Sequence, residues 1–139
     1  MATPYEKIYG RFLNRITDFN LADLDDYTLN EMLKNWLYSA VVKVRTSSDL
    51  SKRDEENGAF VNDLTDIDVE LLAMGMTLAW LDQTLNSTEL TLQFVGGKEE
   101  KYYSQANHIA ELRALRADTL REMQQLYTYG TYTNNDYFD

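Results

Sequence analysis

The sequence predicts an all-α protein, a small bundle of four to five helices with an extended aromatic C-terminal arm. Only one proline and six glycines occur in 139 residues, so long stretches are free to be helical. Apolar residues recur at three- and four-residue spacing over several segments, which is the period of a helix. The chain has no cysteine, so packing has to stabilise the fold without disulfides. We expect a helical domain over residues 1–126 and the arm over residues 127–139.

The first two helices each begin with a predicted capping box, in which Thr precedes the helix and Glu follows three residues later. The first box is TPYE at residues 3–6, with proline at the first helical position, and an apolar stripe follows it as far as Ile16. The second box is TLNE at residues 28–31, and one apolar face follows it to about Arg45. Lys43 and Arg45 then lie in the last turn, where cations suit the negative end of the helix dipole.

The third predicted helix begins at TDID, residues 65–68, where the acids match the positive end of the dipole. Its apolar residues cover two opposite faces, so it belongs in the centre of the bundle. Gly75 lowers helix stability there, and the close approach of a neighbouring helix would explain it. One face carries Ile67, Leu71, Met74, Leu78 and Leu81, and the other carries Val69, Leu72, Met76, Ala79 and Trp80.

The segment before this helix, residues 46–63, shows no sustained apolar period. It is long for a loop without secondary structure inside a compact domain. We therefore expect it to be functional, partly helical or ordered by a partner.

After the third helix, a short helix is predicted over Ser87–Phe94, and Gly96 and Gly97 end it. A charged loop follows. The last long helix is predicted from about residue 104 to residue 126, and Gly130 is expected to prevent its continuation.

Arg116 interrupts the apolar arc of the last helix, because on a helical wheel it falls between Leu112 and Ile109. Two interpretations remain open. Its stem packs while the charge reaches solvent, or its guanidinium meets a carboxylate on another helix or another subunit, since a buried unpaired charge is prohibitive.

The composition argues against several function classes. A formal net charge of −10 repels phosphate, so nucleic-acid binding through a basic surface is disfavoured. One histidine, His108, and no cysteine leave no HExxH zinc motif and no thiol nucleophile, and no Ser lies in a GxSxG turn. Three weaker patterns are rejected as well. Gly96-Gly97-Lys98 is an incomplete phosphate loop, and Asp18, Asn20 and Asp23 form an incomplete calcium loop. The last pattern is a group of acids that helix capping explains, namely Asp63, Asp66, Asp68 and Glu70. We expect no enzyme, no cofactor and no metal.

No membrane segment is expected either. The longest uncharged apolar run, Leu71–Leu81, would rise about 16 Å as a helix, roughly half of a bilayer core. The opening MATPYEKIYGRF lacks the apolar core of a signal peptide, so export by that route is not expected.

The end of the chain is unusually aromatic. Its last 13 positions contain no Lys or Arg, and they include Tyr127, Tyr129, Tyr132, Tyr137 and Phe138. Tyrosine brings a large contact area with a polar end, which favours interfaces. The segment either folds back over its own bundle or docks against a partner, since dangling aromatics would waste apolar area in water.

Three strings carry a family resemblance: PYEKIYGRFLNRI (Pro4–Ile16), NDLTDIDVELLA (Asn62–Ala73) and YSQANHIAELRAL (Tyr103–Leu115). They resemble small proteins encoded among the head genes of tailed phages of Gram-positive hosts, a family similar to head–tail connector proteins, also called adaptors or neck proteins. The resemblance implies a helical protein of the virion neck, made in the host cytoplasm, that forms a dodecameric ring under the portal. Such a ring would extend the DNA channel and present a surface to the next neck protein.

The resemblance also implies roles for particular residues. C-terminal segments of such proteins reach into the portal, so the five aromatic residues at the end of the chain would form a portal-docking arm. Ring contacts between subunits need two different surfaces. Candidates are Arg116, the Trp80 side of the third helix and the segment 46–63. An acidic ring would let double-stranded DNA pass without specific binding.

Two rival interpretations stand beside the connector. An acidic inhibitor that mimics DNA and blocks a nuclease would account for the charge. A mimic should, however, work as a monomer or dimer and needs no aromatic tail. A small enzyme whose site is shared between subunits is the third possibility, and the single His and absent Cys weigh against it.

Overall fold

A computed structural model of the chain describes residues 2–16, 25–46, 49–95 and 99–134. Within these residues the chain is a helical bundle, as predicted, with a small sheet that the sequence pattern did not indicate. The helices are α1 (Tyr5–Arg15), α2 (Asp26–Lys43), α3 (Asp66–Val95) and α4 (Glu99–Asn134), and the strands are β1 (Thr3–Pro4), β2 (Arg53–Asp54) and β3 (Ala59–Phe60).

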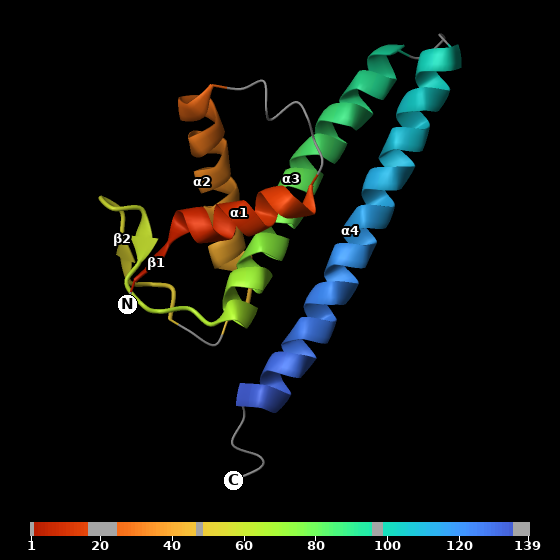
Figure 1. Cartoon of the computed structure of the whole chain (residues 1–139). Helices are drawn as coiled ribbons and strands as arrows, with labels where there is room; N and C mark the ends of the chain where they lie inside the picture. The colour runs from red at the N-terminus through yellow and green to blue at the C-terminus, as the bar shows by residue number, and fades with distance from the viewer. Residues whose placement is uncertain (1, 17–24, 47–48, 96–98, 135–139) are drawn as a thin grey trace.

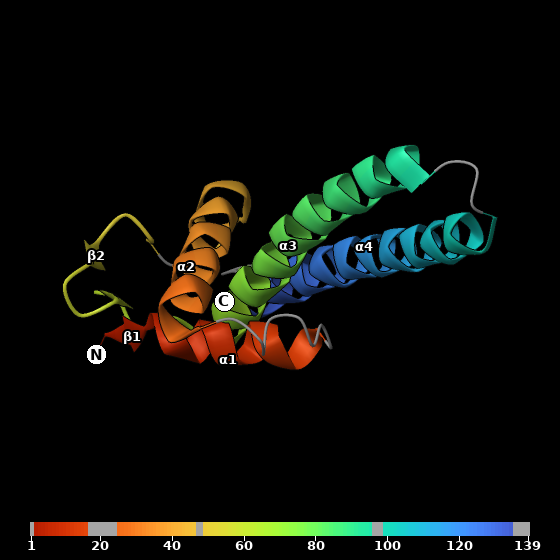
Figure 2. The same cartoon turned by 90° about the horizontal axis from the view of Figure 1, so that it is seen from above.

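The two longest helices, α3 and α4, form an antiparallel hairpin (Figure 1). Helices α1, α2 and α4 all contact α3, which is therefore the centre of the bundle. Seen from above, the end of the hairpin where α3 ends and α4 begins extends beyond α1 and α2 (Figure 2). The core consequently lies where the first half of α3 meets the other three helices.

The predicted environment of α3 is confirmed. Val69, Leu72 and Leu81 are fully buried, and these residues come from both of its apolar faces. Gly75 meets the C-terminal end of α2, because a Cβ atom added there would lie 2.5 Å from Val44 Cγ2 and 2.8 Å from Ala40 Cβ. The absence of a side chain at Gly75 thus permits the close approach of α2 that the sequence indicated.

Both predicted capping boxes are wrong, whereas the third helix start is correct. Thr3 does not cap α1: its hydroxyl donates to the carbonyl of Asn62 (3.0 Å) and accepts from the N–H of Leu64 (2.9 Å). Thr3 belongs to strand β1 instead, and α1 begins at Tyr5 without a side-chain cap. Helix α2 begins one turn earlier than predicted, because the Asp25 carboxylate accepts from the N–H of Thr28 at 2.8 Å. At the start of α3, the Thr65 hydroxyl accepts from the N–H of Asp68 at 3.1 Å, as expected.

The segment 46–63 contains a β-hairpin and no helix among its described residues. Strand β3 lies between β1 and β2 and is antiparallel to both. Gly58 has a positive φ of 63° in the turn between β2 and β3, a conformation that glycine adopts without strain. Phe60 of β3 is fully buried, with its ring centroid 5.0 Å from that of Tyr5. Contacts within the chain therefore hold residues 53–60 in place.

Glu55 ties this hairpin to α2. Its carboxylate accepts hydrogen bonds from the hydroxyls of Tyr38 and Tyr5. Lys34 lies 3.9 Å from the same carboxylate. The Arg53 guanidinium lies 5.4 Å from the centroid of the Tyr38 ring, within the range of a cation–π contact. These contacts fix the hairpin against the outer side of the bundle.

The long helices differ from the prediction at three places. The short helix expected at Ser87–Phe94 is part of α3, which continues to Val95. Helix α4 begins at Glu99 and passes through Gly130 to Asn134, so the extended arm is wrong for residues 127–134. One helical glycine costs about 1 kcal/mol, which a 36-residue helix can absorb. Among the described helices, no stretch is both long and apolar enough to cross a membrane.

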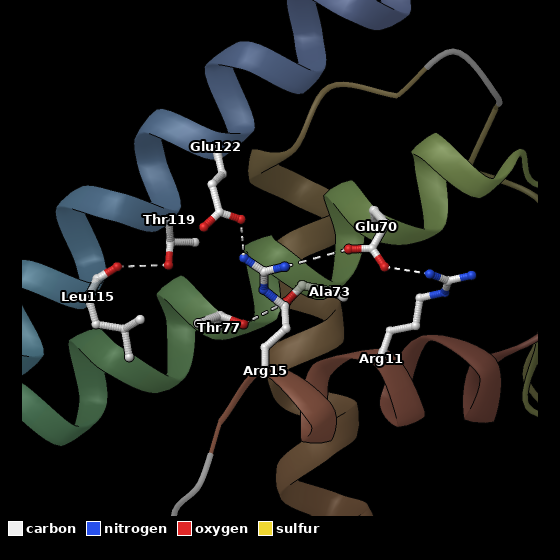
Figure 3. A network of polar contacts seen from close by, with 8 residues as sticks. All are labelled: Arg11, Arg15, Glu70, Ala73, Thr77, Leu115, Thr119 and Glu122. Carbon is white, nitrogen blue, oxygen red and sulfur yellow. Dashed lines mark hydrogen bonds and ion pairs between the residues drawn. The ribbon is translucent and has the colours of Figure 1, made fainter.

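An arginine of α1 bridges α3 and α4 (Figure 3). The two terminal nitrogens of Arg15 lie 3.6 Å from a Glu70 oxygen and 2.7 Å from a Glu122 oxygen. Arg11 binds the other oxygen of Glu70 at 2.6 Å. Arg15 is well shielded, with 21% of its side chain exposed. The network therefore joins three helices through one partly buried charge.

Replacing Arg15 by methionine is expected to lower the free energy of unfolding by about 1–2 kcal/mol, between the values for exposed and buried ion pairs. Methionine retains an apolar stem of similar length, so the loss reports the two charge contacts. Urea denaturation measures it. The control is Arg121→Met, because within the described part of the chain Arg121 pairs only with Asp118 one turn away, and both side chains are more than half exposed. Its expected effect is below about 0.5 kcal/mol. Equal effects would contradict a bridging role for Arg15.

Candidate functional site

A groove of about 490 Å³ lies between the C-terminal end of α2, the first half of α3 and the second half of α4. Its volume is within the range of protein ligand sites, roughly 300–1,000 Å³. It is lined by Lys43, Val44 and Arg45, by Gly75, Leu78, Ala79 and Asp82, and by Arg116, Leu120, Met123, Gln124 and Tyr127.

The groove follows from how α2 ends. Gly75 lets the end of α2 lie directly on α3, and Val44 then leaves the helical conformation with its N–H bonded to Ala40 O at 2.8 Å. No further turn of α2 therefore covers α3 beyond this point. Helix α4 continues past the same level and forms the opposite side. The end of α2 thus leaves a depression between α3 and α4 that Val44, Leu78, Leu120 and Met123 line with apolar side chains.

Arg116 lies in this groove and has a partner within its own chain. Its Nε atom is 2.8 Å from Asp82 Oδ1 on α3. Of the two interpretations of the sequence, the guanidinium therefore meets a carboxylate on another helix. The side chains of Arg116 and Asp82 are 40% and 45% exposed, so the pair remains accessible from the groove.

Tyr127 also lies in the groove, and its assignment to a free docking arm is wrong. Its hydroxyl accepts a hydrogen bond from the backbone N–H of Arg45 at 3.2 Å, and its ring packs against the core. Tyr127 follows Leu120 and Met123 at helical spacing, so it lies on the side of α4 that faces the groove. Tyr129 and Tyr132 belong to α4, but their side chains are outside the described ones; Tyr137 and Phe138 lie beyond the described residues.

Trp80 is not available as a subunit contact. It is 6% exposed and belongs to the core, and its neighbour Ala79 lines the groove instead. The reason is that α3 is covered on both apolar faces.

A second depression of about 310 Å³ adjoins the groove and shares Lys43, Ala79 and Asp82 with it. In its lining, the Trp36 indole N–H donates to Gln83 Oε1 at 2.9 Å.

The charges of the groove are opposite to those of the chain. Lys43, Arg45 and Arg116 face one carboxylate, Asp82, whereas the whole chain has a formal charge of −10. Neither Lys43 nor Arg45 pairs with a carboxylate among the described residues. Two basic side chains beside apolar and aromatic surface favour an acidic partner with an apolar group. The sequence pattern indicated only that Lys43 and Arg45 interact with the dipole of α2. The closeness of the two cations in the sequence was the only further sign of a binding site.

The lining of the groove contains no Ser, Thr, Cys or His. Among the described residues, no three His, Cys, Asp or Glu side chains gather as a metal site. Of the acids at the start of α3, Glu70 binds Arg11 and Arg15. The single histidine, His108, is exposed on α4. The incomplete calcium and phosphate loops lie outside the described residues.

Comparisons with known proteins do not add an assignment to this geometry. No family model matches the sequence, and no curated protein or solved structure matches it significantly. The function is therefore inferred from the residues of the chain, its fold and the resemblance of its three strings.

Proposed function

We propose that the chain is a structural virion protein, a head–tail connector that forms a ring under the portal of a tailed phage. The ring extends the DNA channel and joins the capsid to the next neck or tail-joining protein. The three strings that resemble this family belong to α1, to the start of α3 and to the first half of α4. Since α1 and α4 both contact α3, the three strings belong to helices of one bundle.

The end of α4 is the observation that supports this proposal most strongly. The helix continues from Tyr127 to Asn134, a further rise of about 10 Å. Figure 1 shows its last turns passing the N-terminal end of α3. The chain has no charged residue from Met123 to Asn135, although 26% of all its residues are charged. An uncharged, tyrosine-bearing helix end beyond the core suits docking against a second polypeptide.

The docking arm is therefore redefined as the end of α4 with the residues after it, namely residues 129–139. Tyr129 and Tyr132 are its helical aromatics, and Tyr137 and Phe138 follow in the sequence. Many copies in one ring would engage the portal together, so modest contacts would add up to a stable attachment. The acidic chain leaves double-stranded DNA to pass through the ring without specific binding.

The ion pairs weaken the rival interpretation as a DNA mimic. A mimic needs carboxylates that remain free to contact the DNA-binding site of a nuclease. Here six described carboxylates contact basic side chains of the same chain: Glu55, Asp66, Glu70, Asp82, Asp118 and Glu122. Six of the 23 acidic residues of the chain are thus paired within the fold.

Removal of the arm tests the proposal. A chain truncated after Thr128 keeps Tyr127 and the groove, so its thermal unfolding should match that of the full chain. We expect it to lose co-purification with the cognate portal, measured by the mass of the complex. Equal portal binding by both chains would exclude the docking arm. A full chain that ignores the portal but inhibits a nuclease would instead support the DNA mimic.

A further inference from the structure

We propose that the groove receives the N-terminal end of α2 from a second copy, so that neighbouring copies join head to tail. The occupant is the acidic tip, defined as Asp25, Asp26, Tyr27 and Glu31. This contact deepens the proposed function, on which it rests, by assigning the two different surfaces that every subunit of a ring requires.

The acidic tip is exposed, and it begins with the capping residue of α2. Tyr27 is 75% exposed, an unusual position for a large aromatic side chain. Asp25, Asp26 and Glu31 are also exposed. The Asp25 carboxylate accepts from the N–H of Thr28 at 2.8 Å, which fixes the first turn of α2. Hydrogen bonds from Thr28 also lower the pKa of Asp25, which favours its ionised form. The tip therefore presents three carboxylates around an exposed ring.

The groove offers the complementary groups. Lys43 and Arg45 line the groove at the C-terminal end of α2. Their positive charge complements the carboxylates of the acidic tip from the second copy. Leu78, Leu120 and Met123 supply apolar surface for an aromatic ring. Opposite charges around an apolar contact select the register of an interface and disfavour wrong partners. The lining thus matches both the charge and the aromatic character of the tip.

Geometry places this contact between copies. The tip and the cations of the groove occupy opposite ends of the 18-residue helix α2, which are about 27 Å apart. A rigid helix cannot bring its own two ends together. Each copy therefore presents its tip to one neighbour and its groove to the other. Such a heterologous contact builds a ring when the rotation between neighbouring copies closes.

Residues 135–139 do not compete for the whole groove. Arg116 precedes Asn134 by about 27 Å along α4. Five residues span at most about 17 Å when extended, so this segment cannot reach the Arg116–Asp82 end of the groove. A foreign acidic peptide would also match the charges, and the experiment separates it from a second copy.

Disulfide cross-linking tests the contact, because the chain contains no cysteine and every introduced thiol is unique. One chain carries Asn30→Cys, an exposed position of α2 beside the tip that leaves Tyr27 in place, and a second chain carries Gln124→Cys in the groove. The control partner carries Asn107→Cys, an exposed position of α4 remote from the groove. We expect the Asn30–Gln124 heterodimer to form about tenfold faster or more than the control, because docking raises the effective thiol concentration. Equal rates would overturn the proposal and leave a foreign peptide as the occupant.

Charge reversal makes the test specific. Arg45→Glu in the groove chain should slow cross-linking to the rate of the control. Adding Glu31→Lys to the tip chain should restore it, which a merely misfolded variant would not allow. Wild-type portal binding is measured in parallel. If the wild-type chain forms a ring on the portal while cross-linking is unspecific, the tip–groove contact alone is wrong. If the wild-type chain does not bind the portal, the connector function is wrong.

Discussion

Replacing Phe60 by alanine is expected to lower the free energy of unfolding by about 3–5 kcal/mol, the usual cost of truncating a buried phenylalanine. Phe60 is fully buried and meets the Tyr5 ring edge-on. It lies on β3, which pairs with β1 and β2, so the cavity would open where the hairpin joins α1. The sheet has only two residues per strand, and its few hydrogen bonds cannot compensate for this loss.

Chemical denaturation monitored by circular dichroism measures this effect. Val61→Ala is the matched control, because Val61 is the next residue and is 49% exposed. Its expected change is within about 0.5 kcal/mol. If Phe60→Ala were as mild as the control, the hairpin would be an appendage and not part of the core.

Replacing Gly75 by leucine is expected to destabilise the protein by about 3 kcal/mol, at the upper end of overpacking effects. A Cβ atom there would already lie 2.8 Å from Ala40 Cβ and 3.3 Å from Ala40 Cα. The second atom belongs to the backbone of α2, so the helix itself would have to move. Even Gly75→Ala should destabilise, because the clash outweighs the gain of about 1 kcal/mol in helix propensity.

Gly10→Ala is the control for this prediction. Gly10 is also inside a helix, but a Cβ atom there would have no neighbour within 4 Å. The same substitution should therefore stabilise the protein by roughly 0.5–1 kcal/mol. Thermal unfolding of both variants gives the comparison. A stabilising Gly75→Ala would show that α2 does not approach α3 as closely as described. Because Gly75 lies in the groove, its leucine variant should also weaken the tip–groove cross-link.

The helices of the core could be predicted because their signals are local. The apolar faces of α3 recur with the helical period, and Thr65 and the acids after it mark its start. Gly75 indicated a close neighbour, although its identity, the end of α2, required the fold. The start of α1 was misjudged because Thr3 bonds to Asn62 and Leu64, far along the chain. These distant hydrogen bonds compete with helix capping by Thr3, and the local sequence around Thr3 does not reveal them.

The candidate site was predicted in part. Arg116 was recognised because a charge on an apolar arc needs an explanation, and Asp82 became its partner only through the packing of α3 on α4. Tyr127 was singled out for its aromatic character, and its helical face places it in the groove and not in the arm. The groove itself is lined by parts of three helices that are distant in the sequence. Such a surface has no period that a sequence pattern could reveal.

By itself the sequence determined the helical class, the central position of α3, the acidity of the chain and the aromatic character of its end. These properties depend on side-chain type and on spacing within one helix. Tertiary structure alone decided the hairpin of residues 53–60, the continuity of α4 through Gly130 and the meeting of Lys43, Arg45 and Arg116. The physical reason is that contacts between distant segments arise from competing packing arrangements, whose free energies the local pattern does not contain.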